Sequence, residues 1–501
     1  MRLSSVLSLL ASLCLLACRA HTPEKVELSE GMRPLPAELE QKATQAVESR
    51  LPIPTQSVVI TGGTVMTGDG KRFAPGYVVI SAGKITQVGE GTPPAIPEAL
   101  SIDATGRFVT PGLIDSHSHL GVYPSPSTSA HNDGNEATDP ITAGVWAEHS
   151  FWPEDPGIER AVAGGVTAAG ILPGSANVIG GRGVVLSFKP HRGSRAMRLP
   201  GAPEIIKMAC GENPKRVYGS QRRTPSTRMA NLRSLRDAYF KAQKYQRDWD
   251  RYLKKLEKGA KSAQDARHSS APVGGAGGKD EPTPPDRDPG LETLAMVLSG
   301  KALVQWHCYT ADDMLSALQV ADEFGFRVRS FHHAVDAYKI RDILANKDVS
   351  VSTWADWYGF KVEAWDAIPE NIALLHAQGV RAIVHSDSAI GIQMLNLEAG
   401  KALGSGRAMG LTLSDDDALR WITLNPAWAL GIQDLAGSLT PGKRGDVVIW
   451  TGSPFQIRSR AERVLIEGEE IYNMNQATAP WSDFELGYSE SVRPVPLEVK
   501  K

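Results

Sequence analysis

The amino-acid sequence predicts an α/β barrel joined to a small all-β domain that is built from both ends of the chain. Short apolar strands alternate with helical stretches through residues 109–435, and about eight such units suffice to close a parallel sheet into a barrel. The flanking residues 57–108 and 436–475 instead contain short strands separated by glycine turns, which is typical of antiparallel β-structure. A length of 501 residues accommodates one barrel and one small domain.

The overall composition is that of an ordinary globular protein. Hydrophobic residues make up 42% of the chain, and the formal net charge is −2. Because the chain has no basic excess, we expect no nucleic-acid partner.

Residues 1–20 have the pattern of a bacterial export signal. Arg2 is followed by an apolar run over residues 6–17, which is too short to span a membrane. The run ends in Leu-Leu-Ala before Cys18, which resembles a lipoprotein cleavage box whose cysteine becomes lipidated; cleavage after Ala20 is the alternative. We therefore expect an exported protein, either in the periplasm or held at a membrane through the lipidated cysteine.

The all-β segments supply strand candidates on both sides of the barrel. These candidates are residues 57–66, 77–80 and 84–88 on the N-terminal side, and residues 464–467 and 470–472 on the C-terminal side. Glycine turns at Gly83 and Gly468 separate neighbouring strands. We expect the two ends of the chain to pair into one small β-sandwich.

The middle of the chain supplies the strands and helices of the barrel. The strand candidates are residues 113–114, 166–172, 205–210, 302–307, 327–332, 349–353 and 381–385. Helices are expected between them, for example over residues 310–324 and 371–378. Cys210 and Cys308 lie at the ends of separate strands, so one disulfide can form, whereas a disulfide scaffold is excluded.

An insertion at about residues 222–288 interrupts the alternation of strands and helices. Residues 222–258 are charged and have a helical pattern, and residues 262–288 are rich in Ser, Gly and Pro. The glycine-rich stretch 272–278 buries nothing and is expected to be mobile. A solvated helical hairpin is favoured over a basic arm that binds a partner.

Residues that can bind metal close several of the predicted strands. His117 and His119 follow an apolar run, and because strand side chains alternate, both imidazoles lie on one face and can reach one ion. Other candidates of this kind are Lys207 or Glu212, His307, His332 or His333, and Asp387. The carboxyl ends of barrel strands carry the active site, so we expect these side chains to converge there.

The motifs around these residues resemble those of the amidohydrolase superfamily. They are TPGLID at 110–115 followed by the two histidines, GGVT at 164–167, VHSD at 384–387, TLNPA at 423–427 with LG at 430–431, and the segment 437–450. The resemblance covers roughly residues 57–475 and is strongest to the imidazolonepropionase-like group, which includes deaminases, ring-opening hydrolases and dipeptidases. It implies a distorted TIM (β/α)8 barrel with a β-sandwich from both termini.

The resemblance also implies roles for the histidines. His117 and His119 take the metal positions of the first strand, and His307 takes that of the fifth strand. At the sixth strand the resemblance favours His333 as the ligand, with His332 in a supporting role. The implied cofactor is a divalent metal, zinc foremost, as one ion or two.

Two further positions complete the implied ligand set. Asp387 ends the eighth strand, where the resemblance makes it a metal ligand and the proton shuttle. The fourth-strand ligand is either Glu212, as in related deacetylases, or a carbamylated Lys207 that bridges two metals, as in related dipeptidases. Residues five apart have opposite parity on a continuous strand, so both are not expected to point inward. Glu212 is nearer the expected strand end and is favoured.

Four other residues near these motifs are possible contributors to the site. His385 lies on the same strand face as the shuttle aspartate, where it contacts substrate, a second metal, or a ligand through a hydrogen bond. His131 and His149 follow the first strand and are interpreted as exposed or structural. The glycine-rich residues 173–183 lack the lysine and serine of a P-loop and predict an active-site turn, with Arg182 as a candidate for binding a substrate carboxylate.

The function predicted from these features is metal-dependent hydrolysis of a C–N bond in an amide, peptide or cyclic amide. A bound divalent ion activates water, and Asp387 accepts the water proton and passes it to the leaving nitrogen. The expected partner is a small-molecule or short-peptide substrate, with no substrate-binding residue assigned, and an oligomer is compatible with the sequence. The alternatives are a heterocycle deaminase with the same ligands and a non-catalytic surface lipoprotein.

Overall fold

A computed structural model describes residues 52–268 and 282–476 of the chain. Contacts divide these residues into two units, one of residues 246–268 with 282–285 and the other of residues 52–245 with 286–476. The export signal expected over residues 1–20 lies outside the described residues, as does the glycine-rich stretch expected to be mobile.

The smaller unit contains the distal part of helix α6 (Arg228–His268), which is 41 residues long. This helix begins within the insertion that the charge pattern predicts to be helical, but in the described residues it is one continuous helix that extends into the predicted Ser/Gly/Pro-rich stretch, and not the two helices of the expected hairpin. In the described part of the chain, no helix is both long enough and apolar enough to cross a bilayer.

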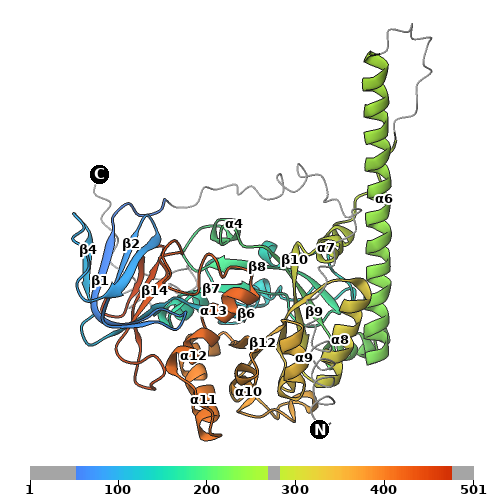
Figure 1. Cartoon of the computed structure of the whole chain (residues 1–501). Helices are drawn as coiled ribbons and strands as arrows, with labels where there is room; N and C mark the ends of the chain where they lie inside the picture. Colours follow the sequence, from blue (N-terminus) through green and yellow to red (C-terminus); the bar gives the residue numbers. More distant parts are fainter. Residues whose placement is uncertain (1–51, 269–281, 477–501) are drawn as a thin grey trace, which may run out of the picture. The chain divides into compact units, whose positions relative to one another are not determined.

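The larger unit contains a nearly closed barrel of eight strands that are neighbours in chain order (Figure 1). The strands are β6 (Leu113–Ser118), β7 (Val166–Ile171), β8 (Ile179–Ser187), β9 (Glu204–Ala209), β10 (Ala302–Cys308), β11 (Val328–His333), β12 (Ser350–Thr353) and β13 (Ala382–Val384). Strands β6 and β7 are buried at every position, as expected of a sheet that is covered on both faces. The backbone N–H of Asp387, just beyond β13, donates to the carbonyl of His117 at 3.2 Å and links the two edges.

Helices alternate with these strands in the order that a barrel requires. Besides the first part of α6, the helices of the larger unit are α3 (Pro156–Ala163), α4 (Ser194–Met197), α5 (Glu212–Ser220), α7 (Pro289–Leu298), α8 (Ala311–Phe324), α9 (Arg341–Asn346), α10 (Asn371–Ala377), α11 (Leu395–Ala408), α12 (Asp415–Trp421) and α13 (Leu424–Ala429). Short 3-10 helices are η1 (Ser129–His131), η2 (Ala147–His149), η3 (Ala337–Ile340), η4 (Val362–Ala364) and η5 (Gly391–Met394). Local sequence explains several ends: Asp155 caps α3 before a proline, and α8 stops at Gly325, whose φ is +76°.

Strand β8 is the part of the barrel that the sequence did not predict. It pairs antiparallel with both β7 and β9, whereas all other neighbours in the barrel are parallel. Its first residues belong to the glycine-rich segment that predicts a turn, because glycine lacks the side chain that signals a strand. Gly181 is required there, since its φ is +112° and a Cβ would lie 2.4 Å from the carbonyl oxygen of Val145.

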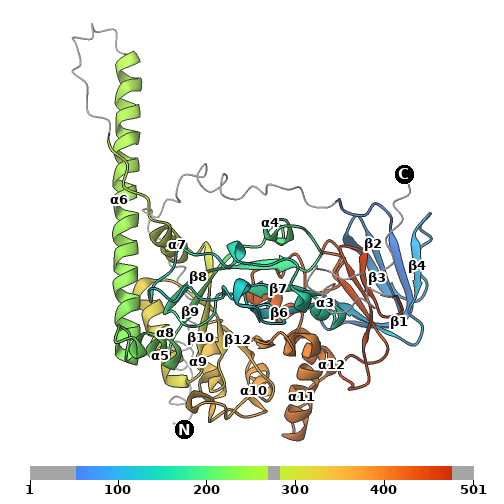
Figure 2. The same cartoon turned by 180° about the vertical axis from the view of Figure 1, so that it is seen from behind.

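The second sheet of the larger unit joins both ends of the described chain, which confirms the predicted composite β-domain. Its strands are β1 (Val58–Met66), β2 (Arg72–Ser81), β3 (Lys84–Glu90), β4 (Leu100–Asp103), β5 (Phe108–Pro111), β14 (Val447–Trp450), β15 (Ala461–Ile466) and β16 (Glu469–Asn473). Strands β5 and β14 pair antiparallel and connect the two ends, so the blue and red strands lie side by side in Figure 1 and in the reverse view of Figure 2. Strand β5 leads directly into β6, so this sheet anchors the first strand of the barrel.

Candidate metal centre

The carboxyl ends of barrel strands bring histidines and one aspartate together. One group comprises His117, His119 and Asp387, and a second comprises His117, His333 and His385. Within each group the ligand atoms lie within 4.8 Å of one another, so each can hold a metal ion. The ends of three strands far apart in the sequence, β6, β11 and β13, therefore meet at one point.

Asp387 lies at the centre of this cluster. Its Oδ1 atom is 3.1 Å from His119 Nε2 and 3.5 Å from His117 Nε2, and its Oδ2 atom is 3.7 Å from His333 Nδ1. Its backbone has a φ of +48°, and that of His333 has a φ of +70°. Left-handed backbone costs free energy for residues other than glycine and collects at functional sites.

The imidazole rings are oriented by neighbouring backbone and side chains. His119 Nδ1 donates to the carbonyl of Leu172 at 2.7 Å, which leaves Nε2 facing the cluster. His332 lies between Gln305 and His117. Its Nε2 atom is 2.8 Å from Gln305 Oε1, and its Nδ1 atom is 2.9 Å from His117 Nδ1. The structure thus places His333 in the cluster and gives His332 a supporting position.

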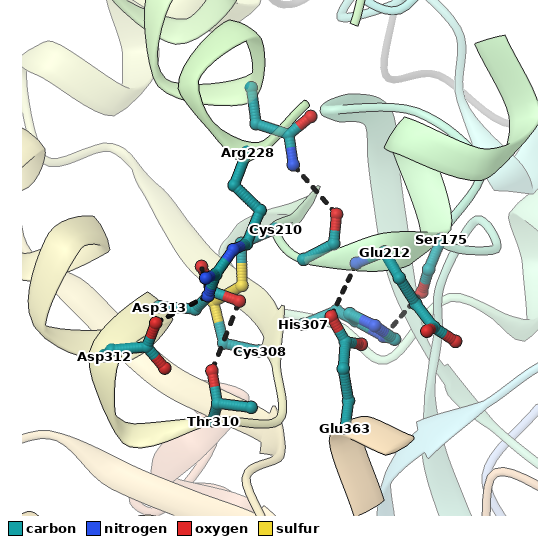
Figure 3. The surroundings of a disulfide bond; sticks show 12 residues. Ser175, Cys210, Glu212, Arg228, His307, Cys308, Thr310, Asp312, Asp313 and Glu363 are labelled. Atoms are coloured by element: carbon teal, nitrogen blue, oxygen red, sulfur yellow. Dashed lines mark hydrogen bonds and ion pairs between the residues drawn. A yellow bond between two sulfur atoms is a disulfide. The ribbon is translucent and has the colours of Figure 1, made fainter. Parts of the chain in front are cut away.

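Several ring nitrogens in this region are buried without a hydrogen-bond partner. These are Nε2 of His307, Nδ1 of His333 and Nδ1 of His385. His307 is held on its other side by Ser175, whose Oγ lies 2.9 Å from Nδ1 (Figure 3). Buried polar atoms are normally hydrogen-bonded, so nitrogens left open in a cluster fit the coordination of a cation.

Burial keeps five histidines of this region neutral, which is the form that binds metal. Burial is the main cause that lowers the pKa of His117, His307, His332 and His333 well below the usual range, and neighbouring Lys207 adds to the effect. Burial likewise lowers the pKa of His385 to about 4. The ring nitrogens are therefore available to a cation at neutral pH.

Lys207 of β9 also points into the cluster. Its Nζ atom is 3.4 Å from His117 Nε2 and donates to the carbonyl of Pro173 at 3.1 Å. The residue is fully buried, and burial lowers the pKa of its amine to about 8. A buried amine with this pKa is neutral in an appreciable fraction of molecules near neutral pH.

Glu212, favoured from sequence as the fourth-strand ligand, lies outside the cluster. Strand β9 ends at Ala209, and Gly211, with a φ of +74°, turns the chain before Glu212 begins helix α5. The Glu212 carboxylate lies 3.5 Å from Lys361 Nζ, and its side chain is 31% exposed. The parity argument assumed a strand that continues to residue 212, and that assumption is wrong.

A disulfide joins the ends of β9 and β10 next to the cluster (Figure 3). Cys210 and Cys308 lie 5.4 Å apart at Cα, and Cys308 follows His307 directly. The possibility that the sequence left open, one disulfide between strand ends, is realised in the structure.

Three other sequence candidates lie away from the cluster. His131 stacks on Trp152, and His149 stacks on Trp146, with ring centroids 4.6 Å and 5.0 Å apart. Arg182 belongs to β8, lies over the Trp146 ring and donates to Thr293 Oγ1 at 2.9 Å.

Sequence reasoning also missed residues that shape the cluster. Asp115 is fully buried and accepts hydrogen bonds from the backbone N–H groups of His117 and Ser386, and burial raises its pKa to about 7. It belongs to the TPGLID motif, so the motif could have indicated that Asp115 lies next to the site. Ser175 lies in the glycine-rich segment predicted to form an active-site turn, although its contact with His307 was not predicted. Gln305 carried no such signal, because its role depends on a contact with the distant His332.

Comparisons with known proteins indicate the family and the fold of the chain. The model of the amidohydrolase family matches residues 368–477. A solved structure titled as an amidohydrolase from Thermotoga maritima is 36% identical, with a TM-score of 0.71, and the alignment covers 83% of this chain and all of that one.

Curated relatives have related names. "Amidohydrolase tasK" of Hapsidospora irregularis is 33% identical over 417 residues, which are 80% of this chain, and the chain spans only 40% of that protein's length. A D-hydantoinase of Rhizobium radiobacter is 33% identical over 100 residues, or 20% of this chain and 21% of the enzyme.

Proposed function

The chain belongs to the amidohydrolase superfamily, and from this premise we propose that it is a metal-dependent hydrolase that cleaves a C–N bond in an amide, peptide or cyclic amide. The observation that carries the proposal is the set of buried, neutral histidines with open ring nitrogens around Asp387. A protein without a ligand for these nitrogens would bear the cost of their burial without compensation.

The donor set supports one or two divalent ions. Imidazole nitrogens and a carboxylate are ligands that Zn²⁺ prefers, and zinc is the ion we propose. His117, His119 and Asp387 would hold one ion, and His307 and His333 have open nitrogens for a second.

Lys207 would complete a two-ion site as a carbamate. The neutral form of its amine would add to carbon dioxide and lose one proton, which gives a carbamate anion with two oxygen donors. The lowered pKa of the amine and its distance of 3.4 Å from His117 Nε2 support this assignment over Glu212.

Asp387 is proposed to move the proton of the reaction. When bound, a divalent ion supplies Lewis acidity, which polarises the scissile carbonyl and makes water easier to deprotonate. Burial raises the pKa of Asp387, but other effects outweigh it, foremost the hydrogen bond with His119, and hold the pKa below its usual range. The carboxylate therefore accepts the proton of the attacking water and returns it to the leaving nitrogen.

Metal analysis combined with a substrate screen tests this function. We expect purified chain to contain about one or two zinc-like ions and to hydrolyse a member of a panel of dipeptides, N-acyl amino acids and hydantoins. A chain that neither carries nor takes up metal contradicts the proposal. Release of ammonia from heterocycles without hydrolysis of amides would instead support the deaminase.

We further propose export, with attachment to a membrane through lipidated Cys18. The support is the apolar run and the small-residue box in residues 6–18. Labelled fatty acid should be incorporated into the wild-type chain and absent from Cys18→Ser; equal labelling of both contradicts the attachment.

A further inference from the structure

An apolar pocket adjoins the metal centre, and the proposed chemistry does not use it. Its volume is about 270 Å³, and His385 and Ser386, which border the centre, form one side. The opposite walls are apolar side chains from the segments that follow β12 and β13: Trp354, Trp357, Ile390 and Met394. Segments that follow barrel strands form the substrate cleft in this type of fold.

An aromatic face runs continuously from the metal centre into this pocket. Trp354 stacks on His333 with ring centroids 4.7 Å apart, and its Nε1 donates to the carbonyl of Ser386 at 3.0 Å. Trp357 stacks on the outer side of Trp354 at 5.6 Å. A group that lies against Trp357 is therefore two rings away from a candidate metal ligand.

The outer wall of the pocket exposes apolar surface to solvent. Trp357 is 41% exposed, Ile390 67% and Met394 39%. Exposed apolar side chains that gather around a cleft are typical of a ligand-binding surface. Glu398, the carboxylate that lines the pocket, is paired with Lys401 at 2.7 Å, so it does not recruit a cationic group.

We propose that this pocket binds an aromatic or large aliphatic group of the substrate, carried close to the scissile C–N bond. The inference rests on the proposed function and names the substrate class. A volume of 270 Å³ lies below the range of about 300–1,000 Å³ for whole small-molecule ligands, so it suits one ring-sized substituent.

Matched substrate pairs test the inference. Each pair has a methyl and a benzyl member in one scaffold: a dipeptide, an N-acyl amino acid or a 5-substituted hydantoin. We expect wild-type kcat/KM to favour the benzyl member by about ten- to hundredfold, the factor that burial of one ring gives. Trp357→Ala should lower the ratio of the two kcat/KM values at least fivefold. This corresponds to a loss of roughly half of the binding free energy that the ring contributes.

Trp365→Ala is the matched control. Trp365 lies in the same segment, is 73% exposed and does not line the pocket, so its replacement should leave the preference unchanged. Ile390→Ser serves as a second pocket variant if Trp357→Ala fails to fold. A wild-type chain without preference, or equal preference in wild type and both pocket variants, overturns the inference and leaves the proposed function standing.

A binding measurement covers the case in which no pair is turned over. Dissociation constants are measured by calorimetry for the same pairs on zinc-loaded Asp387→Asn. At least tenfold tighter binding of benzyl members, reduced by Trp357→Ala in that background, supports the pocket even if the proposed hydrolysis fails. Equal dissociation constants for the two members overturn it.

Discussion

Two clusters of buried polar side chains in the larger unit differ in how many of their polar atoms have hydrogen-bond or ion-pair partners within the chain. In the composite sheet, Arg444 Nε lies 2.9 Å from Asp446, Nη1 lies 2.6 Å from Glu467, and Nη2 donates to Ser187 at 3.0 Å. The charges of this cluster are paired within the protein. The cluster also ties the composite sheet to the end of barrel strand β8.

The histidine cluster at the barrel mouth is different, because ring nitrogens of His307, His333 and His385 have no hydrogen-bond partner. Folding alone completes the Arg444 cluster, whereas the histidine cluster needs something outside the chain to complete it. The difference teaches that burial of polar groups marks a candidate site only when their hydrogen-bonding capacity is left open.

The largest expected effect separates catalysis from the binding of metal. Asp387→Asn should lower kcat by about 10²–10⁴-fold, the contribution of a positioned acid–base group, while metal content stays near that of the wild type. Activity assays and metal analysis on one preparation check this. Retained turnover would remove the shuttle role from Asp387.

Mutation of the Arg444 cluster should lower the stability of the protein and leave its metal content unchanged. Arg444→Met removes the cation paired with buried Asp446 and one of the cations beside Glu467, which also lies 3.9 Å from Lys189, so the free energy of unfolding should fall by about 3–5 kcal/mol in a denaturant titration. Arg463→Ala is the control in the same sheet: its pair with Glu470 is partly exposed, and the loss should stay below about 1 kcal/mol. Similar losses in the two variants would contradict the distinction.

Mutations at Lys207 and Glu212 test which of the two residues belongs to the histidine cluster. Lys207→Ala should weaken metal binding at least about tenfold, whereas Glu212→Ala should leave it unchanged, because only the lysine reaches the histidines. Competition with a chelator measures both affinities. Loss of metal in Glu212→Ala with retention in Lys207→Ala would restore the assignment that the sequence favoured.

The fourth prediction is a pH dependence of stability in metal-free protein. His385 has a folded-state pKa of about 4, below the ordinary value of about 6.5, so between these pH values the unfolded state binds a proton that the folded state does not. The free energy of unfolding should therefore fall as pH drops from about 6.5 to about 4, by up to about 1.4 kcal/mol per pH unit for this residue.

The other histidines of the cluster act in the same direction, whereas Asp115, with a pKa of about 7, opposes them. Comparison with His385→Asn isolates the contribution of one ring, since the variant should show the shallower slope in denaturant titrations across this range. Identical slopes would show that this histidine is not buried in its neutral form.

Much of the fold was predictable because local patterns carry it. Alternating strands and helices indicated the barrel, and glycine turns at both ends indicated the composite sheet. Strand β8 was not predicted, because its glycines interrupt the pattern of apolar residues that indicates a strand. The role of Trp354 and Trp357 in the pocket was not predicted, because the sequence does not distinguish an aromatic residue that lines a pocket from one that packs in the core.

By itself, the sequence determined which side chains stand at strand ends, since strand period and motif place His117, His119 and Asp387 there. Only the tertiary structure decided which neighbour completes the cluster. Lys207 and Glu212 are both close to the end of β9, but Lys207 points from the strand into the histidine cluster, whereas Glu212 follows the turn at Gly211 and lies half-buried beside Lys361. The physical reason is that local periodicity orients a residue within its element, whereas contacts across more than a hundred residues decide what it meets.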